Sequence, residues 1–212
     1  IFKNAALQYI LFGVVMCIVG FLATEKILPY AWQSSFATTF AYAIASIGFC
    51  LLMGYSGLAS LGTGGFIGIG TYAVHYIMVE AGLPFFVALL SAIIVSVVIG
   101  LIVGFISLRI EGIYLVILTL ALSEILRTLY AAIEPKLTLS SSDAVLFGVK
   151  FPRTSSLMLV SFFLVIVMII TTNLINSPTG RAMLAMKNST AAAQAMGISL
   201  IKYRLMAFVI CT

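Results

Sequence analysis

The sequence predicts an all-α protein that crosses a membrane several times as a bundle of transmembrane helices. Hydrophobic residues make up 63% of the 212 residues, and charged residues only 8%. Soluble domains carry about 25% charged residues, so this chain has too few charges to cover a surface that faces water. Its apolar residues gather in runs of about 20, the length of a helix that crosses the hydrocarbon core. Because lipid cannot satisfy an open backbone, these runs are expected to be helices.

About seven apolar runs are expected to form spans, within a single transmembrane domain over residues 1–212. The third run is short, and the seventh ends with the sequence. Since the chain also begins without methionine, we expect it to be a portion of a longer polypeptide. The expected runs are 5–23, 36–53, 66–79, 85–106, 112–133, 156–175 and a final run from about 205.

The positively charged residues predict the orientation of the chain. The formal net charge is +5, and the basic residues lie mostly in the connections between apolar runs. This distribution is typical of a membrane protein, and we expect no binding to nucleic acid. Segment 176–204 contains four basic residues and no acidic one. Cytoplasmic loops carry an excess of Lys and Arg, so this segment and the amino terminus are expected in the cytoplasm. The hydrophilic loop 134–155 then faces outward.

A glycine-rich segment interrupts the apolar pattern, with seven glycines in residues 54–70. Glycine lets the backbone leave a helix and lets a neighbour approach closely. Transporters place broken helices of this kind at their substrate sites. The alternative is tight helix packing through small residues, as in the pairs Gly64/Gly68 and Gly100/Gly104. Both interpretations stay open. The candidate solute-pathway residues in this segment are Gly54, Tyr55, Ser56, Gly57, Ser60, Gly62, Thr63 and Gly64.

The fifth run carries the only charges deep within an apolar segment, Glu124 and Arg127. Three residues apart on a helix, they are close enough to form an ion pair. With Thr119 and Ser123 they are expected to form one polar stripe that turns away from lipid. Charges inside a membrane are functional candidates, so Thr119, Ser123 and Glu124 join the candidate pathway. The alternative is a structural ion pair that holds this helix to its neighbours.

The polar segment 176–204 is expected to form two short amphipathic helices at the cytoplasmic surface. Pro178 favours a helix start, and Gly197 favours a helix end. Methionine and leucine side chains alternate here with Arg181 and Lys187. Such a surface suits either lipid headgroups or a groove on a partner protein. Nowhere does the sequence present a catalytic constellation or a set of metal ligands, so no catalytic or metal residue is predicted.

Three stretches, taken in order, resemble a known family. The chain resembles the permease subunits of branched-chain amino acid ABC importers, and their M-type subunit more than their H-type. The resemblance covers most of the chain, from about residue 54 to residue 208. The first stretch runs from Gly54-Tyr55-Ser56-Gly57 through Ser60-Leu61-Gly62 to Gly68-Ile69-Gly70-Thr71-Tyr72. The second is Leu108-Arg109-Ile110-Glu111-Gly112-Ile113-Tyr114-Leu115 with Thr119-Leu120-Ala121 and Glu124-Ile125-Leu126-Arg127, and the third is Gly180-Arg181 to Gly197-Ile198.

The resemblance implies that a coupling region, about 176–204, docks into the cleft of a cytoplasmic ATPase. Family members usually place acidic residues there, whereas this chain has Asn188, Thr190 and Gln194. This departure concerns the details of the ATPase contact. The coupling residues implied by the resemblance are Gly180, Arg181, Lys187, Ala192, Ala193, Gln194 and Gly197.

The resemblance also implies the partner subunits with which this chain would assemble. Two ATP-binding subunits would hold ATP and magnesium, so this chain needs no cofactor and is no enzyme. A second permease subunit, identical or different, and an extracytoplasmic solute-binding protein would complete an importer in the bacterial plasma (inner) membrane, surrounded by lipid. Its solutes would be branched-chain or other hydrophobic amino acids, or urea and short amides. The rival class is an ATP-independent secondary transporter or channel, which would need no coupling region.

Overall fold

A computed structural model describes residues 12, 13, 15, 30–107, 110, 112–133, 145–146, 149–150 and 156–212 of the chain. These residues are helical except for short connections and one small hairpin, so the prediction of an all-α fold is confirmed. The helices are α2 (Tyr30–Cys50), η1 (Leu51–Tyr55), α3 (Thr63–His75), η2 (Tyr76–Glu80), α4 (Phe85–Ser107), α5 (Ile113–Ile133), α6 (Ser156–Asn176), α7 (Pro178–Asn188), α8 (Thr190–Ala195) and α9 (Leu200–Cys211). Here η1 and η2 are single π-helical turns that continue α2 and α3.

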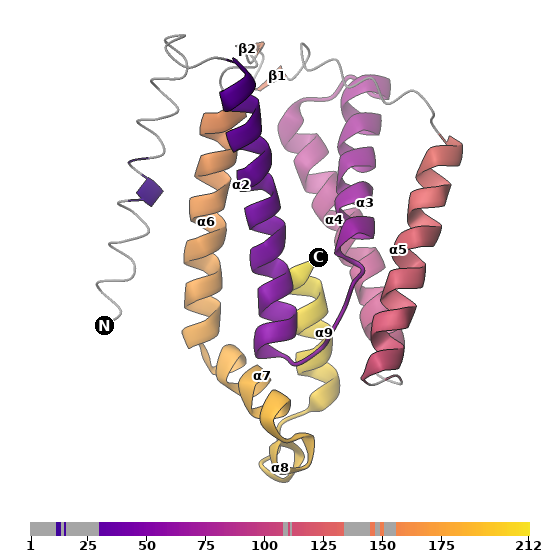
Figure 1. Ribbon diagram of the computed structural model, residues 1–212, viewed down its shortest axis with the longest axis vertical. Coiled ribbons are helices and arrows are strands. Elements are labelled where there is room, and N and C mark those ends of the chain that lie inside the picture. The colour runs from indigo at the N-terminus through magenta and orange to yellow at the C-terminus, as the bar shows by residue number, and fades with distance from the viewer. Residues whose placement is uncertain are drawn as a thin grey trace.

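The hairpin pairs two-residue strands, β1 (Val145–Leu146) and β2 (Val149–Lys150), in antiparallel register. It lies at one end of the bundle, and α7 and α8 lie at the opposite end (Figure 1). The long helices run between these two ends (Figure 1). The loop 134–155 and the coupling region 176–204 were expected on opposite sides of the membrane, and the described parts of both agree with that expectation.

Four helical segments among the described residues are long and apolar enough to cross a membrane: Trp32–Tyr55, Phe85–Ile106, Ile113–Ala132 and Leu157–Asn176. The sequence predicted about seven membrane spans, three more than these four. The first expected run, 5–23, lies outside the described residues except for positions 12, 13 and 15. The third expected run corresponds to α3 and η2, of 13 and 5 residues, and the last to the 12-residue α9.

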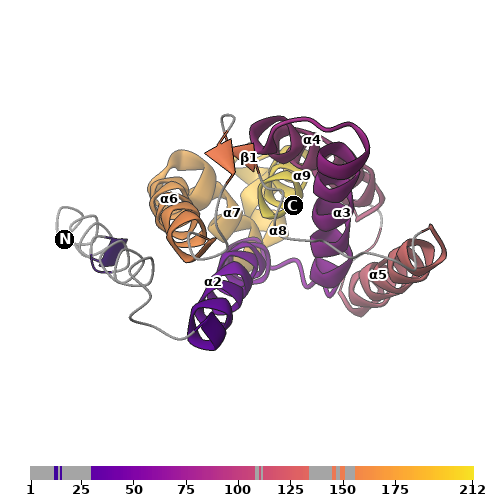
Figure 2. The ribbon, with the colours of Figure 1, turned by 90° about the horizontal axis from the view of Figure 1, so that it is seen from above.

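The helices pack in a chain of neighbours. α2 packs against α6, and α3 lies against both α4 and α5. α9 packs against α4 and also contacts α7, at the end of the bundle where α7 and α8 lie (Figure 1). From above, α5 stands at the edge of the bundle beside α3 (Figure 2). Most of the circumference of α5 therefore meets no other described element.

The buried core lies where the inner ends of these helices meet α7. It joins apolar side chains from η1, the connection after it, α4, α5, α7 and α9. Because burying a leucine, phenylalanine or methionine side chain stabilises a fold by about 1.5–3 kcal/mol where water is the alternative, this cluster fixes α7 to the bundle. Its members are Leu52, Leu58, Val103, Leu115, Met183, Ala207 and Phe208.

Candidate functional site

The non-helical part of the glycine-rich segment begins where α2 and η1 end, after Tyr55. The backbone N–H of Ser56 donates to the Leu51 carbonyl (3.4 Å), and its hydroxyl donates to the Leu52 carbonyl (2.7 Å). Gly57 follows with a φ of +71°, a left-handed conformation that favours glycine. Residues 57–61 then carry no helix, and α3 starts at Thr63. The break is shorter than the expected 54–65, because helical hydrogen bonding continues through Tyr55 and resumes three residues earlier than expected.

A buried hydroxyl on α5 satisfies the backbone of this break. The Leu61 N–H donates to Thr119 Oγ1 (3.1 Å), and Thr119 is fully buried. Thr119 Oγ1 in turn donates to the Leu115 carbonyl (3.0 Å). Ser60 Oγ accepts from the Gly62 N–H (3.4 Å). Since non-helical backbone at membrane depth requires partners within the protein, Thr119 and Ser60 make the break possible there.

Beyond the break, α3 presents glycines to α5 at close approach. A Cβ on Gly65 would lie 3.0 Å from the Cα of Ser123, and one on Gly68 would overlap the ring of Tyr130. Tyr130 donates its hydroxyl to the Gly65 carbonyl (3.2 Å). The ring of Tyr72 stacks on that of Tyr130 with centroids 4.5 Å apart. This geometry supports the packing interpretation for the latter part of the glycine-rich segment.

The other small-residue pair packs in a similar way. A Cβ on Gly100 would lie 2.8 Å from Cγ2 of Thr212, and one on Gly104 would lie 3.2 Å from the Cβ of Phe208. α4 and α9 therefore approach closely along this pair. Gly64, by contrast, would meet only Ser123 Oγ, at 3.5 Å, which is an ordinary contact distance.

An open cleft of about 350 Å³ lies between α2 and α3. Its lining combines small and apolar side chains with two hydroxyl-bearing ones: Ala37, Thr38, Ala41 and Tyr42 of α2, and Ile67 of α3. A lining of this mixed kind is typical of sites for small molecules with an apolar part. The sequence interpretation missed these residues. The spacing of Thr38, Ala41 and Tyr42 along one helical face was the available clue.

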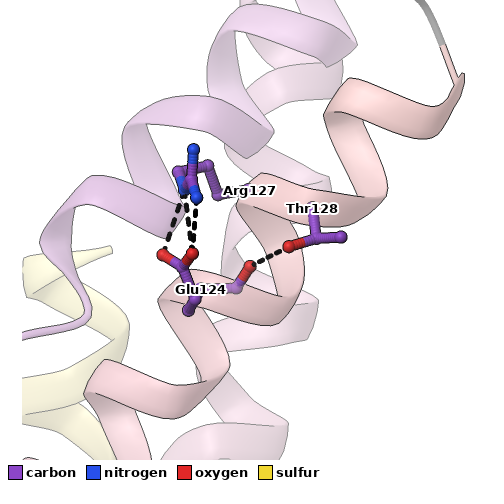
Figure 3. Close-up of polar contacts among 3 residues, drawn as sticks. All are labelled: Glu124, Arg127 and Thr128. Atoms are coloured by element: carbon purple, nitrogen blue, oxygen red, sulfur yellow. Dashed lines mark hydrogen bonds and ion pairs between the residues drawn. The ribbon is translucent and has the colours of Figure 1, made fainter.

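Glu124 and Arg127 form an ion pair within α5 (Figure 3). Arg127 Nε lies 3.0 Å from Glu124 Oε2 and 3.1 Å from Oε1. The two side chains are 59% and 74% exposed, respectively, on the described chain. Thr128 donates its hydroxyl to the Glu124 carbonyl (3.0 Å) on the same turn. The pair therefore does not join α5 to a described neighbour.

The prediction that the polar residues of α5 form a single stripe is wrong. Thr119 is buried against the glycine-rich segment, and Ser123 lies beside Gly64 and Gly65 of α3. Glu124 and Arg127 instead lie on an exposed face. The helix thus has two polar faces. One satisfies the non-helical backbone that precedes α3, and the other carries the Glu124–Arg127 ion pair.

The coupling region forms the two short helices that the sequence predicts. α7 begins with Ser177 as its N-cap, whose hydroxyl accepts from the Gly180 N–H (3.3 Å), and with Pro178 in the first position. A Cβ on Gly180 would lie 2.6 Å from the Leu174 carbonyl, so this residue lets α7 fold back tightly on the end of α6. α7 buries Met183 and Met186 in the bundle.

α8 is the outermost element of this end (Figure 1). Ala193 is buried, whereas Ala192 and Gln194 are exposed, as are Arg181 and Lys187 on α7. Met196 is 80% exposed. Gly197, with a φ of +79°, ends the helix by donating its N–H to the Gln194 carbonyl (2.9 Å). The region thus presents an exposed tip on an anchored base.

One contact joins the two predicted groups of residues. Lys187 of the coupling region donates from Nζ to the carbonyl of Gly54 in η1, at 2.6 Å. The remaining pathway candidates, Tyr55 and Thr63, are half-buried at the two ends of the break.

The four apolar helices and the short helices at one end define a multi-pass, all-helical membrane protein among the described residues. Residues 33–212 match the sequence profile of the family described as "Branched-chain amino acid transport system / permease component", and the chain belongs to this family. Its family and its apolar helices place it in the bacterial inner membrane.

Two curated relatives illustrate the match. The high-affinity branched-chain amino acid transport system permease protein LivM of Salmonella typhimurium is 33% identical over 201 residues, covering 81% of this chain and 47% of that protein. The protein of the same name from Escherichia coli (strain K12) is 30% identical over 227 residues, covering 90% of this chain and 53% of that protein. The chain therefore spans about half the length of the curated relatives it matches. No solved structure matches it.

Proposed function

We propose that this chain is part of the membrane-spanning permease subunit of an ATP-driven importer. The observation that carries the proposal is the arrangement of α7 and α8. α7 buries Met183 and Met186 in the bundle, and the tip formed by α8 exposes Gln194 and Met196. An anchored base with an exposed tip suits a lever that a soluble partner pushes. A secondary transporter needs no such element.

The proposed partners follow from this arrangement and from the family. Two cytoplasmic ATPases hold ATP and magnesium and receive the coupling region, through the exposed Arg181, Ala192, Gln194 and Gly197. A second permease subunit lies beside this one in the lipid bilayer. An extracytoplasmic binding protein delivers the solute to the opposite end, where β1 and β2 lie. In the whole protein, α3, α9 and the run 5–23 act as spans beside the four long helices, which makes seven in this part.

The proposed solute is a branched-chain or other hydrophobic amino acid, with urea or a short amide as further members of the class. Both curated relatives are named as branched-chain amino acid permeases. The cleft between α2 and α3 supports a path for such a solute, since it offers apolar walls with the hydroxyls of Thr38 and Tyr42. Gly54, Tyr55, Ser56 and Gly57 follow further along the chain, where η1 ends and the non-helical segment begins, and we assign them to the continuation of this path.

The proposal is tested by purifying the full-length, tagged protein from its native membrane in mild detergent and identifying the bound chains. An ATPase subunit and a second permease are expected. The complex is then placed in liposomes with its binding protein, and uptake of radiolabelled leucine is measured with and without ATP. A protein that purifies alone, with ATP-independent flux, would establish the rival class of secondary transporter.

A further inference from the structure

The carboxyl-terminal end of η1 leaves backbone carbonyls without partners in the helix. The last carbonyls of any helix point beyond its end and carry partial negative charge. Two of them are satisfied locally: the Leu51 carbonyl accepts from the Ser56 N–H, and the Leu52 carbonyl accepts from the Ser56 hydroxyl and the Leu58 N–H (3.3 Å). The Gly54 carbonyl, which points toward α7, accepts instead from a side chain far along the sequence.

That side chain is Lys187, 133 residues away. Its ammonium lies 2.6 Å from the Gly54 carbonyl oxygen. Its aliphatic stem lies over Gly57: a Cβ there would be 3.0 Å from Lys187 Cγ and 3.3 Å from Lys187 Cβ. A cation at a helix carboxyl terminus is favourable to the helix dipole and caps the free carbonyl. Lys187 thus holds both the last turn of η1 and the left-handed glycine that starts the break.

The helix that carries Lys187 is fixed to the same region by packing. Met183, one helical turn before Lys187, is 1% exposed and belongs to the same buried cluster as Leu52 and Leu58. Leu52 and Leu58 flank the Gly54–Gly57 turn in sequence. α7 therefore contacts the turn at an apolar point and at a polar point, so a shift of α7 has to move the turn or break the polar contact.

The far end of the break is held by another helix. The Leu61 N–H is bonded to the buried Thr119 hydroxyl of α5. Residues 57–61 thus run between an attachment on α7 and an attachment on α5. A short segment without helical hydrogen bonds between two anchors is the part of the chain that most easily changes its backbone angles when one anchor moves.

We propose that Lys187 is a positioning residue: by holding Gly54 and Gly57, it transmits displacement of α7 to the non-helical segment 57–61. This role for Lys187 rests on the proposed function in one respect, namely that a partner ATPase displaces α7. It gives Lys187 a role inside the chain, in place of the direct ATPase contact that the family resemblance implies.

The test measures the segment itself. In the full-length protein with every cysteine replaced by alanine, Cys17, Cys50 and Cys211 among them, Ala59→Cys serves as a half-buried reporter. Its labelling by a membrane-impermeant maleimide is followed in inside-out membrane vesicles. Lys187→Met keeps most of the aliphatic stem and removes the donor. Loss of a charge-assisted hydrogen bond at an exposed site is expected to speed labelling about fivefold. Lys187→Gln replaces it where the methionine variant is not recovered in the membrane.

Lys202→Met is the matched control, since Lys202 is an exposed lysine of α9 whose ammonium lies over the Tyr203 ring, 6.0 Å from its centroid. Its labelling is expected to equal that of the parent, and Lys187→Arg is expected to retain slow labelling. Unchanged labelling in Lys187→Met, or equal acceleration in Lys202→Met, would overturn the proposal.

Transport is measured separately in the assembled complex. Lys187→Met is expected to lower the solute taken up per ATP hydrolysed, with ATP hydrolysis retained. Retained uptake per ATP, despite faster labelling, would refute transmission through Lys187. If the parent complex shows no ATP-driven uptake, the proposed function fails, and the labelling result still decides whether Lys187 positions the segment.

Discussion

Gly68→Ala tests the close contact between α3 and α5 with the smallest possible change. The new methyl group would lie within 3.0 Å of Tyr130 Cδ2 and 3.3 Å of its Cζ, and closer still to the ring edge between them. Gly68 has no positive φ, so the backbone itself accepts alanine. The cost therefore comes from Tyr130 alone. Either the ring moves or the two helices separate.

The magnitude follows from what holds the ring. Moving it breaks the bond from the Tyr130 hydroxyl to the Gly65 carbonyl (3.2 Å), worth about 0.5–1.5 kcal/mol. It also disrupts the stack with Tyr72, worth about 0.5–1.5 kcal/mol. If the ring stays, overpacking costs about 1–3 kcal/mol. Both routes give about 2 kcal/mol. That lowers the thermal midpoint of a unit of 150–250 residues by about 4–8 °C, and by less where a longer chain unfolds as one unit.

The assay is the thermal midpoint of the purified, full-length protein, read from the folded fraction that survives heating in size-exclusion chromatography. Gly70→Ala is the matched control, because a Cβ there meets nothing within 4 Å. It is expected to be neutral or slightly stabilising, as alanine is the better helix former. Tyr130→Ala should remove the penalty of Gly68→Ala in the double variant. An equal midpoint for Gly68→Ala and Gly70→Ala would show that the Tyr130 ring does not restrict the side chain at position 68.

Three further substitutions probe the other parts of the site. Thr119→Val keeps the side-chain volume but leaves the Leu61 N–H without an acceptor, so the same assay should show a loss of stability of about 1–3 kcal/mol. An unchanged midpoint would mean that the hydrogen bond from Leu61 to Thr119 does not stabilise the fold. Glu124→Gln leaves Arg127 without its counter-charge within an apolar helix, so an immunoblot of the membrane fraction should show a lower yield. Replacing both charges by glutamine should restore that yield, and a normal yield in the single variant would make the pair dispensable. Ala41→Phe should fill the cleft and reduce ATP-driven leucine uptake to background at an unchanged thermal midpoint, whereas full uptake would place the solute path elsewhere.

The sequence predicted the helices that the membrane itself dictates. α4, α5 and α6 begin and end within one residue of the expected runs 85–106, 112–133 and 156–175. Hydrocarbon thickness sets their length, and lipid requires the backbone to be satisfied within each helix. The amphipathic pattern after Pro178 likewise predicted two short helices, because caps and breakers act locally.

The prediction for α2 began too late, at residue 36, because hydropathy counted its early polar residues against the helix. In the structure, Thr38 and Thr39 donate their hydroxyls to the carbonyls of Ser34 and Ser35 (2.9 and 2.8 Å). Such bonds satisfy hydroxyl groups within the helix and let polar residues extend an apolar span.

The polar face of α5 was within reach of the sequence but was misjudged. At about 100° per residue, Ser123 lies about 40° around the helix from Thr119, whereas Glu124 lies about 140° from it. Thr119 and Glu124 therefore could not share one stripe. The contact between Lys187 and Gly54 was out of reach, because only the packed fold brings residues so far apart in sequence together.

The proposed function requires that the exposed tip of α8 contact an ATPase, and a site-specific photo-crosslink can capture that contact. A benzophenone amino acid is placed at Gln194 in the full-length protein, expressed with its neighbouring genes in its native host, and irradiated in membranes. A control probe replaces Leu129, which is exposed on α5. An adduct with an ATP-binding subunit is expected from position 194 and none from position 129. Irradiation that gives no ATPase adduct at position 194, with the ATPase present in the same membranes, would contradict the proposed function.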